Sequence, residues 1–254
     1  MLKLLPLLLF VAPAFAQTPT PANAETVEKT ITALKDASKK PVDERVAVIR
    51  AAADVVDVKV IKEVASGLRD RDDAIKTATI EALRFMQHPS ALDALHNTLK
   101  RDKKLRKNAE LHAALIRAVG QHGSPESIDL LVDNLFAGDD YGVIRARIAA
   151  LGNVRDKQAV DALFRLMKSG GRRRVQPFMK SLRLSLMVLT GADQGESQDL
   201  WHSWWNNNKK TLEVAQKEPR LPAKDQRDWD RFWGRERTYQ RNKKRGERGQ
   251  DPEN

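Results

Sequence analysis

The sequence predicts an all-α protein built as a solenoid, a linear stack of helical hairpins. The strong helix formers Ala, Leu, Lys, Arg and Glu dominate the 254-residue chain. We find no run of Val, Ile, Thr and Tyr that alternates with polar residues between hairpin turns, as a strand would require. Charged residues make up 31% of the chain and aromatic residues 6%, which favours a thin, well-solvated helical array over a compact α/β body.

The first 16 residues have the pattern of a secretory signal peptide. Lys3 gives a positive start, residues 4–11 are largely apolar, and the small residues Ala14 and Ala16 stand at the two positions that signal peptidase reads. The segment is too short to span a bilayer as a helix. We therefore expect export to the periplasm or the extracellular space after cleavage near Ala16, with an uncleaved N-terminal anchor as the alternative. Residues 17–24 then form a flexible leader.

Helix breakers divide most of residues 25–190 into helical pairs. Each pair has a first helix, a short turn rich in residues such as Gly, Pro, Asn or Asp, and a second helix. The first helices are predicted at residues 46–56, 74–86, 111–119 and 143–151, and the second helices at residues 60–68, 91–99, 127–136 and 159–167.

The pairs keep a fixed register, which indicates repetition. One apolar or small residue near the end of each first helix recurs at intervals of 31, 36 and 32 residues, namely Ala52, Leu83, Val119 and Leu151. Another apolar residue follows twelve positions later in every unit, namely Val64, Leu95, Leu131 and Leu163. A single pair cannot bury the apolar stripes of both its helices, so several pairs must stack to form a continuous core.

Two segments resemble a known family. Residues 147–152, Arg-Ile-Ala-Ala-Leu-Gly, followed by residues 158–163, Gln-Ala-Val-Asp-Ala-Leu, are similar to the signature of HEAT-like repeats, including the short form found in phycobilin lyases. Residues 114–120 with residues 127–131 match the signature nearly as well. The resemblance implies an array that holds a partner protein. Some branches of the family carry a chromophore or DNA.

A closing segment, residues 191–218, is expected to cap the solenoid after a last helix at residues 177–189. It contains Trp201, Trp204 and Trp205, which fall on one face of a helix. The segment resembles the terminal part of some bacterial exported HEAT-repeat proteins. We interpret the three tryptophans as a buried cap. As an exposed set they would instead form a stacking platform for sugars or bases.

The basic tail, residues 219–254, is expected to be weakly structured. Trp229, Phe232 and Trp233 again fall on one helical face, with Arg and Lys residues around them. Such a pattern can bind nucleic acid or lie on an anionic membrane, although acidic residues neutralise part of the charge. For this aromatic group we favour a helix folded back on the solenoid, followed by a solvated charged end.

Positive charge gathers in two inter-repeat loops and in the tail, and the formal net charge of +11 favours acidic partners. Equivalent loops of a solenoid emerge on one edge, so the two loop clusters are expected on the same side, about 20 Å apart. A solvated edge is the preferred interpretation, and a grip on an anionic polymer is the alternative. The candidate polyanion contacts are Lys100, Arg101, Lys103, Lys104, Arg106 and Lys107 in one loop, Arg172, Arg173 and Arg174 in the other, and Arg231, Arg235, Lys243, Lys244 and Arg245 in the tail.

The sequence shows no catalytic or metal-binding constellation. It contains no cysteine, which excludes disulfides, thiolate metal sites and lipid attachment at a cysteine. The five histidines lack the spacing of a zinc site, and neither a Gly-x-Ser-x-Gly motif nor a phosphate-binding glycine loop is present. We therefore predict no catalytic residue, no metal and no cofactor.

These observations favour a non-catalytic protein-binding scaffold over an enzyme. The partner is expected on the concave surface of the solenoid, which we assign to the second helices. The alternative is a binder of an anionic polymer or membrane surface through the basic loops and the tail. Salt separates the two hypotheses, because added salt steeply weakens binding to a polyanion.

Overall fold

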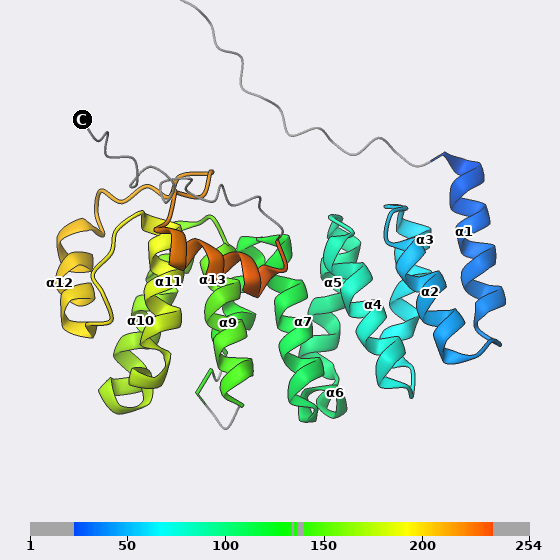
Figure 1. The fold of residues 1–254 in the computed structure, drawn as a ribbon, viewed down its shortest axis with the longest axis horizontal. Helices are drawn as coiled ribbons and strands as arrows, with labels where there is room; N and C mark the ends of the chain where they lie inside the picture. Colours follow the sequence, from blue (N-terminus) through cyan, green and yellow to red (C-terminus); the bar gives the residue numbers. More distant parts are fainter. Residues whose placement is uncertain (1–22, 134, 137–139, 236–254) are drawn as a thin grey trace, which may run out of the picture.

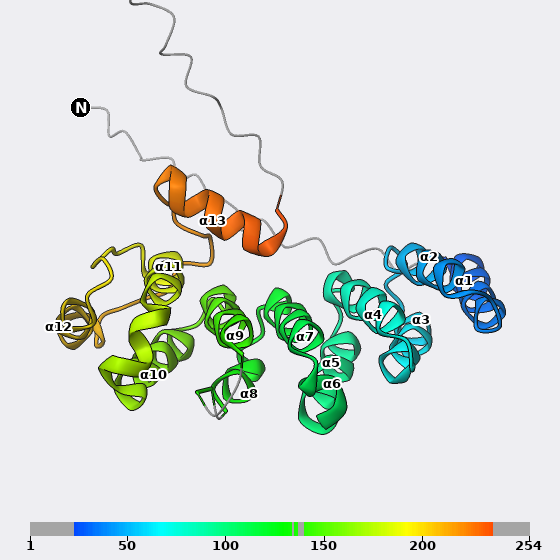
Figure 2. The ribbon, with the colours of Figure 1, turned by 60° about the horizontal axis from the view of Figure 1, so that its bottom comes forward.

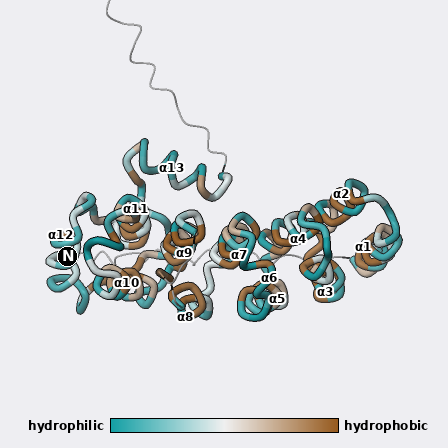
Figure 3. Tube along the Cα trace, turned by 90° about the horizontal axis from the view of Figure 1, so that it is seen from below, coloured by the Kyte–Doolittle hydropathy of each residue, from teal (hydrophilic) through white to brown (hydrophobic). Residues whose placement is uncertain are grey.

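The structure, a computed structural model, describes residues 23–133, 135–136 and 140–235. In these residues every regular element is helical, and the helices stack in two rows (Figures 1 and 3). The predicted all-α solenoid is therefore confirmed. The predicted signal peptide lies outside the described residues. Within them, no helix is both long and apolar enough to cross a membrane.

The two rows contain the first and the second helices of successive hairpins. The first-helix row consists of α2 (Val42–Ala52), α4 (Asp73–Phe85), α7 (Ala109–His122), α9 (Tyr141–Asn153) and α11 (Met179–Thr190). The second-helix row consists of α3 (Val58–Ala65), which continues into the 3-10 helix η1 (Ser66–Arg69), α5 (Pro89–Arg101), α8 (Ile128–Val132) after η2 (Pro125–Ser127), and α10 (Lys157–Val175). The remaining elements are α1 (Ala24–Ala37) and α12 (Gln198–Asn208) at the two ends, the connectors α6 (Lys103–Lys107) and η3 (Gln176–Phe178), and α13 (Ala223–Trp233).

Capping side chains begin the helices where the turns end. Asp57, Asp72 and Asp156 each accept a hydrogen bond from the backbone N–H two residues further on, at the start of α3, α4 and α10. The imidazole of His88 does the same at the start of α5, accepting from the N–H of Ser90. The turns predicted from the sequence are therefore real helix boundaries.

One predicted helix, residues 127–136, is wrong in its length, because α8 ends at Val132. The buried side chain of Arg147 in α9 donates to the carbonyl oxygens of Leu131, at 3.4 Å, and Asp133, at 2.7 Å. These carbonyls are thus satisfied by a side chain from the next hairpin, and the helix stops there.

The array bends towards the first-helix row, as Figure 2 shows. First helices approach closely through small residues: a Cβ added to Gly120 of α7 would lie 2.5 Å from the Cβ of Ala150 in α9. A Cβ on Gly152 would lie 2.6 Å from that of Ser185 in α11. Because the first helices pack more closely than the second helices, they line the inner side of the bend. The expectation that the second helices line the concave surface is therefore wrong.

The helix α12 closes one end of the array and packs on α10. Trp201 is fully buried and donates through its indole N–H to the carbonyl oxygen of Gly195, at 2.8 Å. Trp204 and Trp205 are half-buried, and the ring of Trp205 stacks on Phe164 with centroids 4.7 Å apart. The three tryptophans therefore contact the apolar core and do not form a free platform.

The helix α13 folds back across the first-helix row (Figure 2). Trp229 and Trp233 are each only 1% exposed, and they pack against the solenoid. The preference for a folded-back helix is confirmed, and the expectation of weak structure from residue 219 is wrong for residues 223–233. The reason is burial of the aromatic face, which the spacing at i, i+3 and i+4 makes possible.

Candidate functional site

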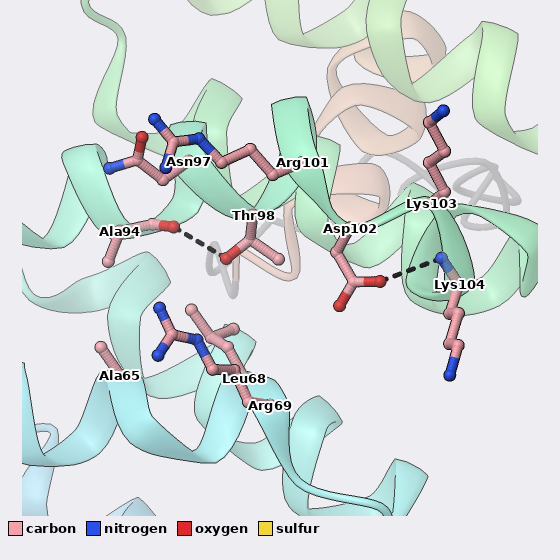
Figure 4. A pocket seen from close by; sticks show the side chains of 10 residues that line it. All are labelled: Ala65, Leu68, Arg69, Ala94, Asn97, Thr98, Arg101, Asp102, Lys103 and Lys104. Atoms are coloured by element: carbon pink, nitrogen blue, oxygen red, sulfur yellow. Dashed lines mark hydrogen bonds between the residues drawn. The ribbon is translucent and has the colours of Figure 1, made fainter.

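A groove with a strongly positive lining lies between the second helices of the first two complete hairpins (Figure 4). It encloses about 580 Å³ between α3 with η1 on one side and α5 with α6 on the other. Apolar groups of Ala65, Leu68 and Ala94 form part of its lining. The groove therefore combines an apolar strip with charged ends.

The η1 side of the groove is fixed by a glycine contact. A Cβ on Gly67 would lie 2.2 Å from the hydroxyl oxygen of Thr79 in α4, so only glycine lets η1 press against that helix. Leu68 is buried in the core, 3% exposed, and this anchors the turn. The next residue, Arg69, is exposed and reaches into the space beneath α5 (Figure 4).

On the other side of the groove, α5 ends in a sharp turn that the hydrogen bonds of Asp102 stabilise. The N–H of Asp102 donates to the carbonyl oxygen of Thr98 at the end of α5, at 2.9 Å. Its carboxylate accepts from the N–H groups of Lys104, at 3.0 Å, and Leu105, at 2.9 Å, at the start of α6. Leu105 is buried and holds α6 in place, so Lys103 and Lys104 stand at the end of the groove.

The charges of the groove are not balanced. Its lining includes four cations, Arg69, Arg101, Lys103 and Lys104, and a single carboxylate, Asp102. Within the described part of the chain, none of the four cations forms an ion pair. All four side chains are exposed.

The nearby carboxylate of Asp70 is committed to other partners. It pairs with Arg45 and accepts from the N–H of Asp72, at 2.9 Å. Burial opposes its ionisation, but these hydrogen bonds outweigh burial and lower the pKa of Asp70. Asp70 therefore stays ionised and bound to Arg45, and it does not neutralise the groove.

The part of the chain that begins with α6, at one end of this groove, resembles a known repeat family. Residues 103–177 match the family model described as HEAT repeats. This segment is similar to HEAT repeats, in agreement with the helical stack. HEAT repeats generally serve as scaffolds for interactions between proteins. A comparison with curated proteins finds no match for the chain.

The predicted loop cluster between the second and third HEAT-like hairpins is partly helical. Lys100 and Arg101 end α5, and the other four residues belong to α6, so the description of this segment as a loop is wrong. The structure brings Arg101, Lys103 and Lys104 together in the groove. Lys100 and Lys107 are exposed and Arg106 is half-buried, and these three do not line it.

The second predicted cluster lies at the end of α10. Gly171 has φ 66°, a left-handed conformation that breaks the helix just before these three arginines. Arg172 pairs with Asp199 of α12, at 2.6 Å, whereas Arg173 and Arg174 are exposed. Figure 1 shows this connection and α6 at the same edge of the array.

The predicted tail contacts have three different outcomes. Arg231 is exposed and lies 3.5 Å from Asp228. Arg235 is used inside the molecule, where it pairs with Glu218 at 2.6 Å and donates to the amide oxygen of Asn153 at 3.1 Å. Lys243, Lys244 and Arg245 lie outside the described residues.

Sequence reasoning missed Arg69 as a groove residue. It stands in the segment Arg69-Asp70-Arg71-Asp72, where alternating charges give no net signal. Only the fold shows that Asp70 turns to Arg45 while Arg69 turns to the groove.

The described residues contain no cluster of three or more His, Asp or Glu side chains that could hold a metal ion.

Proposed function

We propose that the protein is a non-catalytic scaffold that binds an acidic, extended segment of a partner protein in the groove between α3 and α5. The observation that supports this proposal is that the lining contains four unpaired cations and only one carboxylate. An acidic segment would supply the missing negative charge, and such complementarity guides association and orientation.

The apolar strip favours a peptide over a nucleic acid. Ala65, Leu68 and Ala94 offer contacts for small apolar side chains between acidic ones. The groove lining contains no aromatic side chain, whereas single-stranded nucleic acids are usually held by stacking on aromatic rings. The second-helix row, on the outer side of the bend, is therefore the proposed binding surface.

The test is fluorescence anisotropy with a labelled peptide of alternating Glu and Ala, and a Lys-Ala peptide as the opposite-charge probe. The double variant Arg69→Glu/Arg101→Glu should weaken binding of the acidic peptide by about tenfold or more. The matched control is Arg50→Glu/Lys168→Glu, which reverses two exposed charges outside the groove and should change affinity less than about twofold. Equal losses in both double variants would refute the groove as the site.

Export is part of the same proposal, and it rests on the N-terminal pattern alone. Mass spectrometry of the protein purified from its native cells should find a mature N-terminus near Gln17. A chain that retains residues 1–16 would contradict cleavage and favour the N-terminal anchor.

A second candidate function, binding of an anionic polymer, is supported by the shared edge of α6 and the α10–α11 connection (Figure 1). It predicts that Arg173→Ala/Arg174→Ala weakens binding of a sulfated glycan and lowers the steepness of its salt dependence. Binding of the acidic peptide in the groove should not respond to this variant. The Arg173→Ala/Arg174→Ala variant therefore distinguishes the two proposed functions.

A further inference from the structure

A second cavity lies on the opposite row, beneath α13. It has a volume of about 610 Å³ and is enclosed by α9, α11 and α13. Its apolar lining comes from all three helices: Ala149, Leu184, Trp229 and Phe232. A volume between about 300 and 1,000 Å³ is typical of cavities that bind small organic molecules.

The cavity is built into the fold. Trp229 is fully buried beside it, and its indole N–H donates to the carboxylate of Glu218, at 3.2 Å. Arg183 of α11 binds Asp225 at the start of α13, at 2.8 Å, and also Asp193. The burial of Trp229 and the ion pair between Arg183 and Asp225 hold α13 against α11, so the cavity exists before any ligand arrives.

The rim of the cavity is positively charged. It includes the cations Arg145, Lys180 and Arg231 and the carboxylate Asp228. Asp228 lies 3.0 Å from the ammonium of Lys180 and 3.5 Å from the guanidinium of Arg231, so it is shared between two cations. The hydrogen bond from Lys180 lowers the pKa of Asp228, which keeps the carboxylate ionised.

The third rim cation has no such partner. Arg145 is exposed on α9 and forms no ion pair with any described residue. An apolar cavity whose rim has three cations and one carboxylate favours a ligand with an apolar body and a negative end.

We propose that the cavity beneath α13 binds a small amphiphilic carboxylate, with its hydrocarbon chain against Leu184, Trp229 and Phe232 and its carboxylate at Arg145. A cationic amphiphile of the same size would meet the same apolar surface but an unfavourable rim charge. This site is independent of the proposed groove, which lies on the other row of helices.

The test uses isothermal titration calorimetry, with decanoate below its micelle concentration as the probe. Decyltrimethylammonium matches its chain with the opposite charge, and acetate matches its charge without the chain. We expect saturable binding of one decanoate per protein, at least about tenfold tighter than either comparison ligand. Absence of saturable decanoate binding, or equal affinity for decyltrimethylammonium, would overturn the proposal.

The site is located by a matched pair of charge reversals. Arg145→Glu should weaken decanoate binding by about tenfold, whereas Arg50→Glu, an exposed residue of α2, should leave it unchanged. A second variant, Ser181→Phe, places a ring in the cavity and should abolish binding. If Arg145→Glu binds decanoate as Arg50→Glu does, the assigned site is wrong. Binding of the acidic peptide should be the same in both charge reversals, so this result is distinct from failure of the groove.

Discussion

The two halves of the solenoid are held together in different ways. From α1 to α3, each helix contacts only neighbours along the stack, as expected for a repeat array. From α4 to α11, the first helices are also bridged by α13. At one end of that bridge, Arg84 of α4 donates to the carbonyl oxygen of Trp233, at 2.5 Å, and at the other end Arg183 of α11 binds Asp225.

This difference separates two kinds of site. The bridged half contains a cavity whose walls are fixed by a third layer, which suits a small ligand. The open, charged groove lies where the two parts meet, between α3 with η1 on one side and α5 with α6 on the other, and α13 does not cover it; this suits a chain segment. The position of α13 is therefore linked to the kind of ligand that each site is expected to bind.

The largest expected effect comes from removing the bridge. Trp233→Ala deletes a buried indole that packs against Gly120 of α7, and should lower the free energy of unfolding by about 3–5 kcal/mol. Urea denaturation measures this change. Trp204→Ala, at the half-buried end of the array, is the matched control and should cost less. Equal costs would show that α13 does not stabilise the repeats in the way we infer.

A smaller effect is expected where the first helices touch. Gly120→Ala places a methyl group 2.5 Å from the Cβ of Ala150, and the strain should cost about 1–3 kcal/mol in thermal or urea unfolding. Ala150→Gly in the same chain removes the opposing methyl group and should recover part of the loss. Without any recovery, the close contact between α7 and α9 would not be the cause.

The ion pair between Arg183 of α11 and Asp193, in the loop between α11 and α12, should make stability depend on acid pH. The hydrogen bond from Arg183 lowers the pKa of Asp193, so this contribution is complete above the ordinary carboxyl pKa of about 4 and is lost as the pH falls through the lower, folded value. Arg183→Gln should cost about 1 kcal/mol at neutral pH, because Asp193 is partly exposed. Below about pH 4 the difference between variant and parent should shrink, as measured by urea unfolding across pH. A constant difference at every pH would argue against this ionic tie.

The smallest effect on stability is expected in the open groove. Arg69→Glu/Arg101→Glu removes no ion pair between described residues, and its free energy of unfolding should stay within about 0.5 kcal/mol of the parent. The same variant should lose binding of the acidic peptide. A large destabilisation would show that these arginines support the fold.

The sequence was informative where contacts are local and periodic. The recurring position at Ala52, Leu83, Val119 and Leu151 predicts the hairpins, and all four residues are buried. These residues pack against side chains of the same or the adjacent hairpin. The repeat register therefore suffices to predict which residues form the core.

The sequence was less informative where contacts join distant segments. The spacing of Trp229, Phe232 and Trp233 predicts an amphipathic helix, but it does not show that this helix spans the first helices from α4 to α11. The direction of the bend depends on contacts such as Gly120 with Ala150, which no periodicity reports. The groove needs Arg69 and Arg101, from two different hairpins, to line one space, which only the stacked structure shows.

The most direct test of the account is hydrogen exchange, measured by mass spectrometry, on the protein with and without the Glu-Ala peptide. We predict slower exchange on binding in the segments that line the groove, residues 65–69 and 94–104, and no change in α9, α11 or α13. Slower exchange in α13, or no change in the groove segments under saturating peptide, would contradict the assignment of the groove as the protein-binding surface.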